Sequence, residues 1–561
     1  MKMFDRYRLV LAFTAMCGCM GLGAVNLPEL PDRDGFNIKG YVHDGVQEVP
    51  GVLVSDGYSF ARTDADGAYY IASDANAKEV FVILPSGYEY AEIDKGVAGF
   101  FKAIDGSESF QADFALRPIG DDTSFSFFVH ADTQPDIWFN GQVWNEVKEA
   151  YADMGALSQT VAATDGFAPF NLHLGDIIYN GSALNYDYTG YLETLESADY
   201  NLATLPTPGN HDRYYTTDYD KAMALYREVW GPVYYSFNRG KVHFISVDNV
   251  LVKKDGAYTR GISDAAVAWM EKDLSYVEKG APVVFYTHQP MTRNDAALKA
   301  FSGVLDMLKE YDVLILTGHL HRVFNNFPEY APSIRERNHV ALGGYEWRSI
   351  CSQDGVPNGY YVYSVDGTEI SWKFKPTGKD ADKNMFRMYE PGFPDTDLVK
   401  PSDDKTVIVN VWDWDEDWTV TWSLDGVEQG DVPRYEEATD PLAAYQFDNN
   451  PMHPTWETKP TYHLFHCDVP STGSLVKVTV SDPFGRTLSK TLELESESGG
   501  IEAVAPESCG VVKTEFYSLQ GVKVLTVKGS PETDTLPLER GCYVMVSHLM
   551  DGSLRTDKVI L

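Results

Sequence analysis

The sequence predicts an α/β fold whose functional site lies at the carboxyl ends of its strands. Short apolar segments bounded by Gly, Pro or Asn are typical of buried strands. Five such segments each stop on a side chain that metals prefer: Phe125–Asp132, Phe170–Asp176, Leu202–Asp212, Pro282–His288 and Val313–His321. Because ligands of open α/β sheets bind just beyond the carboxyl ends of the strands, we expect these side chains to meet in one crevice.

The side chains at the five strand ends all offer oxygen or nitrogen ligands. They are Asp132, Gln134, Asp176, Asn210, His288, His319 and His321. Carboxylate, amide oxygen and imidazole suit divalent zinc, manganese, iron or cobalt, whereas a thiolate zinc or iron–sulfur site would need Cys. So many ligands favour two ions about 3.5–4 Å apart that share one carboxylate. His319 and His321 would share a face if their strand continued, as joint chelation requires.

Three motifs in order, GDIIYNG, GNHD and GHLH, resemble the signature of the calcineurin-like metallophosphoesterase superfamily across residues 122–345. The resemblance implies a four-layer αββα sandwich flanked by β-sandwich-like domains. It also implies two divalent transition ions (Mn, Fe, Zn or Co) whose bridging hydroxide hydrolyses a phosphomonoester or phosphodiester. Carried over residue by residue, it gives one ion the ligands Asp132, Gln134 and His321, makes Asp176 the bridge, and gives the other ion Asn210, His288 and His319.

The same resemblance assigns the residues that would act on substrate. Asn210 and His211 would contact phosphate oxygens, and His211 would protonate the leaving group while Asp212 orients its imidazole. Guanidinium groups suit phosphate geometry well. The arginines that follow a site motif closely, and are therefore candidate phosphate clamps, are Arg213, Arg293 and Arg322. A surface salt bridge is an equal alternative for each of them.

One motif departs from the commoner pattern. The superfamily usually has Asp-x-His where this chain has Asp132-Thr133-Gln134. A Gln oxygen still coordinates but is a weaker donor than imidazole, so that ion would be held less tightly or be a harder metal. His130 lies on the same strand face as Asp132, where it is either a displaced ligand or, as we favour, a strand histidine bonded to a neighbour. His173 alternates with leucines and is also expected to be a strand histidine.

Three β-rich segments are expected around the catalytic region. Residues 35–118 and 346–492 resemble the N-terminal and C-terminal domains of a bacterial branch of the superfamily. Residues 500–561 resemble the sorting domains of Bacteroidetes-type secretion cargo, with an ordinary small β-sandwich as the alternative. Thr63–Gly67 is predicted to be a turn and not a calcium loop, because the terminal Glu of that loop is missing. The acidic stretch Asp413–Asp417 is predicted to be solvated.

The N-terminus predicts export. Lys2, Arg6 and Arg8 precede the apolar stretch Leu9–Gly23, which is typical of a secretory signal peptide over residues 1–24. We therefore expect a periplasmic, cell-surface or extracellular protein, and such a setting permits disulfides. The cysteines that would remain after cleavage are Cys351, Cys467, Cys509 and Cys542.

Composition limits the class of partner. The chain has 561 residues, which predicts several domains. Its formal charge of −36 disfavours nucleic acid, because phosphates would repel it. A small-molecule or lipid phosphoester is the expected substrate, and the C-terminal segment would contact a secretion machinery; the oligomeric state is not predicted. The rival function is a non-catalytic cell-surface binding or adhesion protein in which Gln134 marks a decayed metal site. Retention of the other motif residues argues against that rival.

Overall fold

The computed structural model describes residues 27–494, with gaps at 136–141, 180–183, 253–256, 344–349, 394–404, 449–457 and 470–473, and then residues 511–518, 523–528, 542–549 and 554–560. The predicted signal peptide, residues 1–24, lies outside the described residues. The chain divides into two compact units, Met1–Glu495 and Ser496–Leu561, which are considered separately. In the described part of the chain, no helix combines the length and apolar character that crossing a bilayer requires.

The first central sheet has seven strands in the order β24-β23-β12-β13-β14-β8-β7. Their bounds are β7 Ile93–Asp94, β8 Val97–Ala98, β12 Ser124–His130, β13 Phe170–His173, β14 Thr204–Pro206, β23 Gly359–Asp366 and β24 Glu369–Pro376. β12, β13 and β14 are parallel, whereas β23 pairs antiparallel with β12. This sheet therefore includes strands on both sides of the predicted catalytic segment 122–345.

The second central sheet has six strands in the order β15-β16-β19-β20-β22-β21. Their bounds are β15 Tyr234–Arg239, β16 Val242–Val247, β19 Pro282–Tyr286, β20 Asp312–Thr317, β21 Phe324–Asn326 and β22 Ile334–Asn338, and a separate hairpin comprises β17 Val250–Val252 and β18 Tyr258–Arg260. β16, β19, β20 and β22 run parallel. The parallel strands consist almost wholly of buried residues, as expected for strands covered on both faces.

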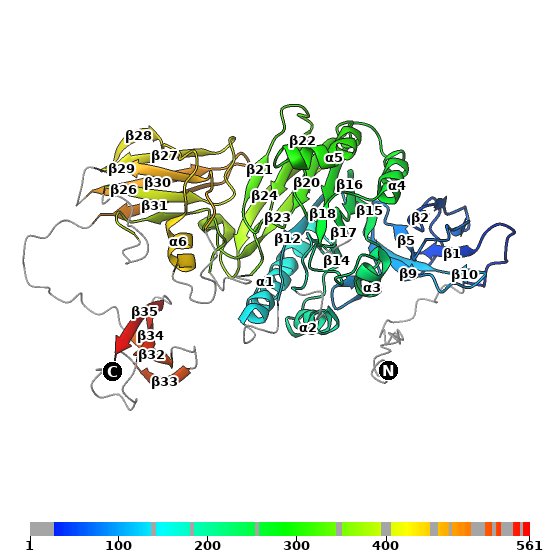
Figure 1. The fold of residues 1–561 in the computed structure, drawn as a ribbon, viewed down its shortest axis with the longest axis horizontal. Coiled ribbons are helices and arrows are strands. Elements are labelled where there is room, and N and C mark those ends of the chain that lie inside the picture. The colour runs from blue at the N-terminus through cyan, green and yellow to red at the C-terminus, as the bar shows by residue number, and fades with distance from the viewer. Residues whose placement is uncertain are drawn as a thin grey trace, which may run out of the picture. The chain divides into compact units, whose positions relative to one another are not determined.

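Helices flank the strands, so the region is the four-layer αββα sandwich that the sequence predicts (Figure 1). They are α1 Gln142–Asp165, α2 Leu184–Ser197, α3 Tyr219–Trp230, α4 Asp264–Leu274 and α5 Asp295–Leu308. Aromatic side chains fill the space between the two sheets. Phe127 and Phe170 of the first sheet meet Phe244 of the second edge-on, at ring-centroid distances of 5.4 and 5.3 Å. This apolar contact fixes the two sheets against each other.

The N-terminal module is a pair of small sheets. One contains β1 Ile38–His43, β4 Ala68–Ile71, β6 Tyr88–Tyr90, β10 Phe110–Gln111 and β11 Phe114–Pro118, and the other β2 Leu53–Ser55, β3 Phe60–Arg62, β5 Glu79–Ile83 and β9 Phe101–Ala103. The stretch Thr63–Gly67 is a turn, as predicted. The Asp64 carboxylate accepts hydrogen bonds from the backbone N–H groups of Asp66 and Ala68, both at 3.0 Å. Asp64 therefore serves the turn itself.

A second β-region follows the central sheets. Its sheets contain β25 Phe386–Tyr389, β26 Thr406–Val411 and β29 Leu464–Asp468, and β27 Thr419–Leu424, β28 Val427–Asp431, β30 Leu475–Ser481 and β31 Thr487–Glu493, together with η2 Ala381–Lys383 and α6 Pro441–Asp448. Buried valines of β26 and β30 form its core. Cys351 and Cys467, which the sequence allows to form disulfides, are both buried, and Cys467 is a free thiol.

The prediction of a solvated acidic stretch at Asp413–Asp417 is wrong for two of its carboxylates. Asp413 and Asp415 are only 1% and 4% exposed, because both form ion pairs with Arg337 of β22. Arg337 also stacks its guanidinium on the Trp372 ring, 4.1 Å from the centroid. A run of acidic residues therefore does not by itself predict solvent exposure, because a buried arginine from another sheet can neutralise it.

The second unit is a four-stranded antiparallel sheet in the order β33-β32-β34-β35. Its strands are β32 Val511–Ser518, β33 Lys523–Lys528, β34 Cys542–Leu549 and β35 Leu554–Ile560. The strand-and-turn pattern expected of residues 500–561 is thus present, while its role in sorting stays a prediction.

Candidate metal centre

The predicted ligands all lie in loops that leave the carboxyl ends of parallel strands. Asp132 and Gln134 follow β12, Asp176 follows β13, Asn210 follows β14, His288 follows β19, and His319 and His321 follow β20. Parallel pairing gathers these strand ends at one edge of each central sheet, and ligands from the two sheets meet there, as the sequence predicts. The strand does not continue through the two last histidines, because β20 ends at Thr317.

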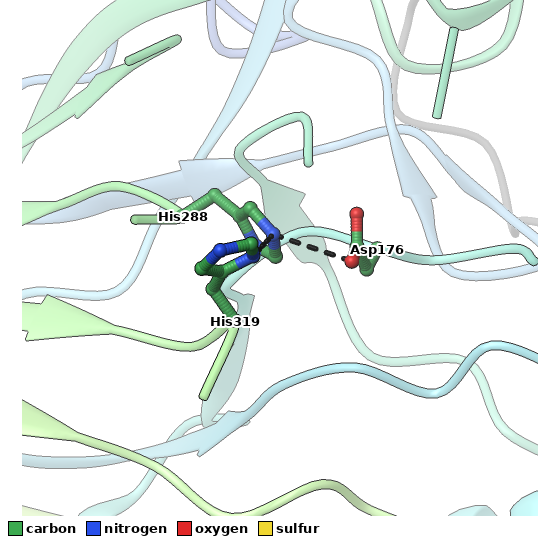
Figure 2. Close-up of side chains that lie close together, drawn as sticks. All are labelled: Asp176, His288 and His319. Carbon is green, nitrogen blue, oxygen red and sulfur yellow. Dashed lines mark hydrogen bonds and ion pairs between the residues drawn. The ribbon is translucent and has the colours of Figure 1, made fainter. Parts of the chain in front are cut away.

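Two groups of side chains are close enough to hold a metal ion each. One group is Asp176, His288 and His319; the other is Asp132, Asp176 and His321; in each, the ligand atoms lie within 4.8 Å of one another. Figure 2 shows His288 between Asp176 and His319, with its Nε2 3.3 Å from Asp176 Oδ2 and 3.1 Å from His319 Nδ1. Asp176 is common to both groups, so its carboxylate lies where a bridging ligand must lie.

The imidazole of His288 is held with one nitrogen turned toward the other ligands. Its Nδ1–H donates to the Leu174 carbonyl at 2.9 Å. Its Nε2 lies 3.1 Å from Asn210 Oδ1 as well as close to Asp176 and His319. A hydrogen bond of this kind on the far nitrogen fixes the tautomer and leaves the near nitrogen free to coordinate. In the other group, His321 Nε2 lies 3.1 Å from Asp132 Oδ1.

Gln134 has the features of a metal ligand. Its Nε2–H donates to Asp176 Oδ2 at 2.8 Å, which fixes the orientation of the amide. Its Oε1 is buried and accepts no hydrogen bond from any described residue. A buried polar atom without a partner is costly and calls for an explanation. A cation bound beside Asp176 supplies one, so the residues present fit a metal centre.

The backbone around the ligands is in an unusual conformation. Asp132, Gln134, Asp176, His319 and His321 have φ angles of 51°, 35°, 54°, 70° and 55°. Residues other than glycine rarely adopt positive φ, and such strain concentrates at functional sites. The positive φ values turn the chain sharply as it leaves each strand. This turn brings side chains from β12, β13 and β20 to a common centre.

Two motif glycines are required by the close approach of ligand carboxylates. A Cβ on Gly209 would fall on the Asp176 carboxylate and on its backbone nitrogen. A Cβ on Gly318 would lie 2.6 Å from Asp132 Oδ2 and 2.9 Å from the Asp132 neighbour Ala131. Real Cβ contacts below 3.0 Å essentially do not occur. The glycines of GNHD and GHLH therefore make room for the two carboxylates.

The electrostatics of the centre favour a cation. Burial opposes ionisation of Asp176, but the nearby charges of His288 and His211 outweigh it and lower the pKa of the carboxyl. Burial likewise opposes protonation of His288, yet Asp176 attracts the proton and raises the pKa of the imidazole to about 9. The protonated His288 is a positive charge that the carboxylate holds in the absence of metal, and a divalent ion would take its place.

His211 is positioned by different groups from those expected. Its backbone N–H donates to Asp176 Oδ1 at 2.8 Å, and its Nδ1–H donates to the Tyr179 carbonyl. The Asp212 carboxylate accepts from the Gly209 and Ile177 N–H groups at 2.7 and 2.9 Å. Asp212 therefore shapes the GNHD loop, and the Tyr179 carbonyl takes the orienting part that the sequence assigned to Asp212. A backbone carbonyl carries no sequence signal, so this role could not be predicted.

His130 and His173 support the site from behind. His130 Nδ1–H donates to Asn171 Oδ1 at 3.0 Å and its Nε2 accepts from Tyr151 Oη at 2.7 Å. Both nitrogens are therefore engaged, which agrees with a strand histidine and not with a displaced ligand. His173 Nε2 lies 3.1 Å from the hydroxyl of Thr133, whose O–H donates to the Ile177 carbonyl at 2.6 Å. His173 thus ties the loop of Gln134 to the loop of Asp176.

The arginines chosen as phosphate clamps differ in their surroundings. Arg213 is 3% exposed, pairs with Asp248 at 3.1 Å and donates to the Gly209 carbonyl, so it holds the GNHD loop and is not placed to bind substrate. Arg322 is half-buried and donates from Nη1 to the Pro460 carbonyl at 3.3 Å. Arg293 is half-buried. Tyr345, Trp347 and Arg348 follow the GHLH motif closely enough in sequence to line the site, and they lie outside the described residues.

The fold and the paired ligand groups define an α/β metallophosphoesterase sandwich with β-rich flanks. Three family models match consecutive segments that together make up more than half of the chain: "N terminal of Calcineurin-like phosphoesterase" at residues 36–119, "Calcineurin-like phosphoesterase" at 127–323 and "C terminal of Calcineurin-like phosphoesterase" at 336–488. The chain belongs to the calcineurin-like phosphoesterase family.

Individual relatives are distant. The chain is 26% identical to mouse (Mus musculus) acid phosphatase type 7 over 171 residues, which make up 28% of this chain and 39% of that protein. Among solved structures, a dimetal phosphatase from Danio rerio is similar with a TM-score of 0.33 and 14% identity, covering 46% of this chain and 97% of the other. Purple acid phosphatase PPD1 from yellow lupin (Lupinus luteus) gives a TM-score of 0.32 and 11% identity, covering 59% and 67%.

Proposed function

We propose that this protein is a metal-dependent hydrolase that cleaves P–O bonds of a phosphomonoester or phosphodiester with two divalent ions. The observation that carries the proposal is the position of Asp176 in both candidate ligand groups. Asp132, Gln134 and His321 would hold one ion, and Asn210, His288 and His319 the other, with Asp176 between them. Such a pair of ions lowers the pKa of a bound water and neutralises charge on phosphate oxygens.

His211 would protonate the leaving group. Because Nδ1–H is donated to the Tyr179 carbonyl, Nε2 is the ring nitrogen that can carry a proton to the leaving-group oxygen. The imidazole also stacks on the Tyr179 ring, with centroids 5.4 Å apart. These two contacts hold the ring in one orientation. The bond from its backbone N–H to Asp176 places it beside the metal ligands.

Metal loading and hydrolysis test the proposal together. The full chain would be stripped with a chelator, reloaded separately with Mn²⁺, Fe²⁺, Zn²⁺ or Co²⁺, and assayed with an aryl phosphate and a bis-aryl phosphate. We expect about two ions per chain and hydrolysis that depends on them. Asp176→Asn should bind less metal and lose activity, because one carboxylate serves both ions. A chain that binds no transition metal and hydrolyses neither ester would contradict the proposal and favour the rival surface-binding function.

We also propose that the protein is exported and acts on a small-molecule or lipid phosphoester. The support is the basic and then apolar N-terminal sequence, Lys2 to Gly23, and the strongly acidic composition. Residues 500–561 would serve the secretion machinery. N-terminal sequencing of the mature protein would test export, since cleavage near residue 24 is expected. An intact Met1 in protein from the native cell would contradict it.

A further inference from the structure

Three arginines from three different segments lie around the proposed metal centre. Arg260 ends β18, Arg293 lies in the loop between His288 and α5, and Arg322 directly follows His321. The hairpin that contains Arg260 touches a ligand, since the ring of Tyr258 lies edge-on to His319 at a centroid distance of 6.3 Å. The three cations are therefore adjacent to the candidate ligands in sequence or in space.

Hydrogen bonds hold these three segments together. The hairpin is tied to the His288 loop because Asn249 Nδ2 donates to the Gln289 carbonyl at 2.6 Å and its Oδ1 accepts from the Gln289 N–H at 2.9 Å. The Arg293 loop is tied to the segment after Arg322 because Asn326 Nδ2 donates to the Thr292 carbonyl at 3.1 Å. The arrangement of the arginines is thus built by the fold and does not depend on contacts of the arginines themselves.

In the described part of the chain, the three guanidinium groups lack carboxylate partners. No described carboxylate forms an ion pair with Arg260, Arg293 or Arg322, and the buried Nε of Arg260 has no hydrogen-bond partner among the described residues. Burial lowers the pKa of Arg293, and the like charges of Arg322 and Arg260 add to that effect. By contrast, the buried Arg213 and Arg337 are both paired with aspartates.

An uncompensated cationic cluster is unexpected in a protein of net charge −36, because carboxylates are plentiful. A half-buried guanidinium without a carboxylate partner gains from pairing with an anionic ligand. The phosphate that is cleaved already has partners in the two ions of the proposed function. The cluster therefore has capacity for a further negative group.

We propose that Arg260, Arg293 and Arg322 form an anion subsite beside the metal centre, and that the substrate is a phosphoester with a second anionic group, either carboxylate or phosphate. The proposal rests on the proposed function for the position of the scissile phosphate. It deepens that function by naming the class of substrate. A planar guanidinium can donate two parallel hydrogen bonds to either a carboxylate or a phosphate.

Matched substrates test the subsite in the metal-loaded full chain. Glycerol phosphate carries only the scissile group, phosphoglycerate adds a carboxylate, and glycerol bisphosphate adds a phosphate. We expect kcat/KM to be at least about tenfold higher for one of the doubly anionic esters, as a charge-assisted pair allows. That preference should fall about tenfold in Arg260→Gln and in Arg293→Gln. Arg260 has a buried Nε, so Arg293→Gln keeps the test available if Arg260→Gln does not fold. Arg335→Gln, on β22, is the control and should keep the preference.

Binding without turnover separates this proposal from the proposed function. Calorimetry on metal-loaded protein would compare phosphonoacetate, which has two anionic groups, with methylphosphonate, which has one. Tighter binding of phosphonoacetate that is lost in Arg293→Gln would support the subsite even if no ester is hydrolysed, in which case only the proposed function fails. Equal binding of both probes by the parent protein would overturn the subsite. Equal weakening of both in the arginine variants would also overturn it, because the arginines would then serve the scissile phosphate.

Discussion

At the scale of single residues, Gln134 shows how one departure from a family pattern is accommodated. The amide gives a hydrogen bond to Asp176 through Nε2 and keeps its buried Oε1 for another partner. A histidine at this position would coordinate but could not both donate to Asp176 and offer an oxygen. Compared with the commoner histidine, Gln134 is therefore a weaker metal ligand but gains a hydrogen bond to the proposed bridging carboxylate of Asp176. This is a different outcome from decay of the site.

The first prediction concerns this glutamine. Gln134→Ala should weaken one of the two metal sites, because the ion beside Asp132 and His321 loses an oxygen ligand, while the ion at Asn210, His288 and His319 stays. Metal titration should then resolve one tight and one weak equivalent, with activity restored by excess metal. Gln134→His should keep or tighten the weaker ion, because imidazole is the stronger donor. Two equally tight ions in Gln134→Ala would show that Gln134 is not a ligand.

The second prediction concerns His211. His211→Ala should leave metal occupancy intact and slow hydrolysis by about 10²–10⁴-fold for a poor leaving group, which is the usual contribution of general acid–base catalysis. The loss should shrink for nitrophenolate, since that leaving group needs no proton. Rates for an alkyl phosphate and a nitrophenyl phosphate, measured on both proteins with metal content determined, check this. An equal loss for both esters would argue against a proton-donating role.

At the scale of elements, the strands of the site could be predicted from the sequence, whereas the contacts that orient the ligands could not. The strands that precede Asp132, Asp176, His288 and His319 are apolar segments in the sequence, so their positions and the convergence of the ligands could be predicted. The orienting carbonyls of Leu174 and Tyr179 could not, because any residue supplies a carbonyl. Nor could the burial of Arg213, whose partner Asp248 is distant in sequence.

The third prediction tests the loop that follows β14. Gly209→Ala should abolish metal binding and hydrolysis, because the new Cβ would collide with the Asp176 carboxylate and its backbone nitrogen. Gly303→Ala is the matched control: it lies inside α5, where a Cβ meets no atom within 4 Å. That variant should keep activity and gain up to about 1 kcal/mol of stability from helix propensity. Metal content and thermal melting of both variants check the prediction, and normal metal binding by Gly209→Ala would refute it.

At the scale of the whole molecule, buried polar groups tie distant segments to the central sandwich. Arg337 of β22 pairs with Asp413 and Asp415 of the later β-region. Asp354, beyond the predicted catalytic segment, accepts from the backbone N–H of Val323 at 2.7 Å, just after the His321 loop. The sequence could not reveal these links, because each joins residues far apart in the chain. The domain boundaries at residues 345 and 346 thus stay a prediction from sequence similarity, and buried polar contacts cross them.

The fourth prediction concerns stability at low pH. His339 is buried, donates from Nδ1 to the Thr317 carbonyl at 3.1 Å and accepts from the Tyr363 hydroxyl at 3.0 Å. Burial, with the charge of Arg337, lowers the pKa of His339 to about 3. Between that value and the ordinary pKa of about 6.5, only the unfolded chain binds the proton. This histidine should therefore cost about 1.4 kcal/mol of stability per pH unit as pH falls through that window.

The check uses His339→Gln and the parent protein, both metal-free, melted at several pH values from 4 to 8. The parent should lose stability more steeply than the variant below about pH 6.5, the ordinary histidine pKa, and the two curves should run parallel above it. Parallel curves across the whole range would show that His339 does not set the acid limit.

The pairing of β23 with β12 has a consequence for which parts of the gene must stay together during evolution. β12 carries Asp132 and Gln134 at its end, and β23, which begins at Gly359, covers its outer side with hydrogen bonds from Ser124 to Val129. A gene fragment limited to the motif-bearing segment would leave β12 as an open edge, ready to pair with another chain. The motifs and the downstream hairpin must therefore be transmitted together. Recombination between them would separate the ligand-bearing loop from the strand that covers this edge.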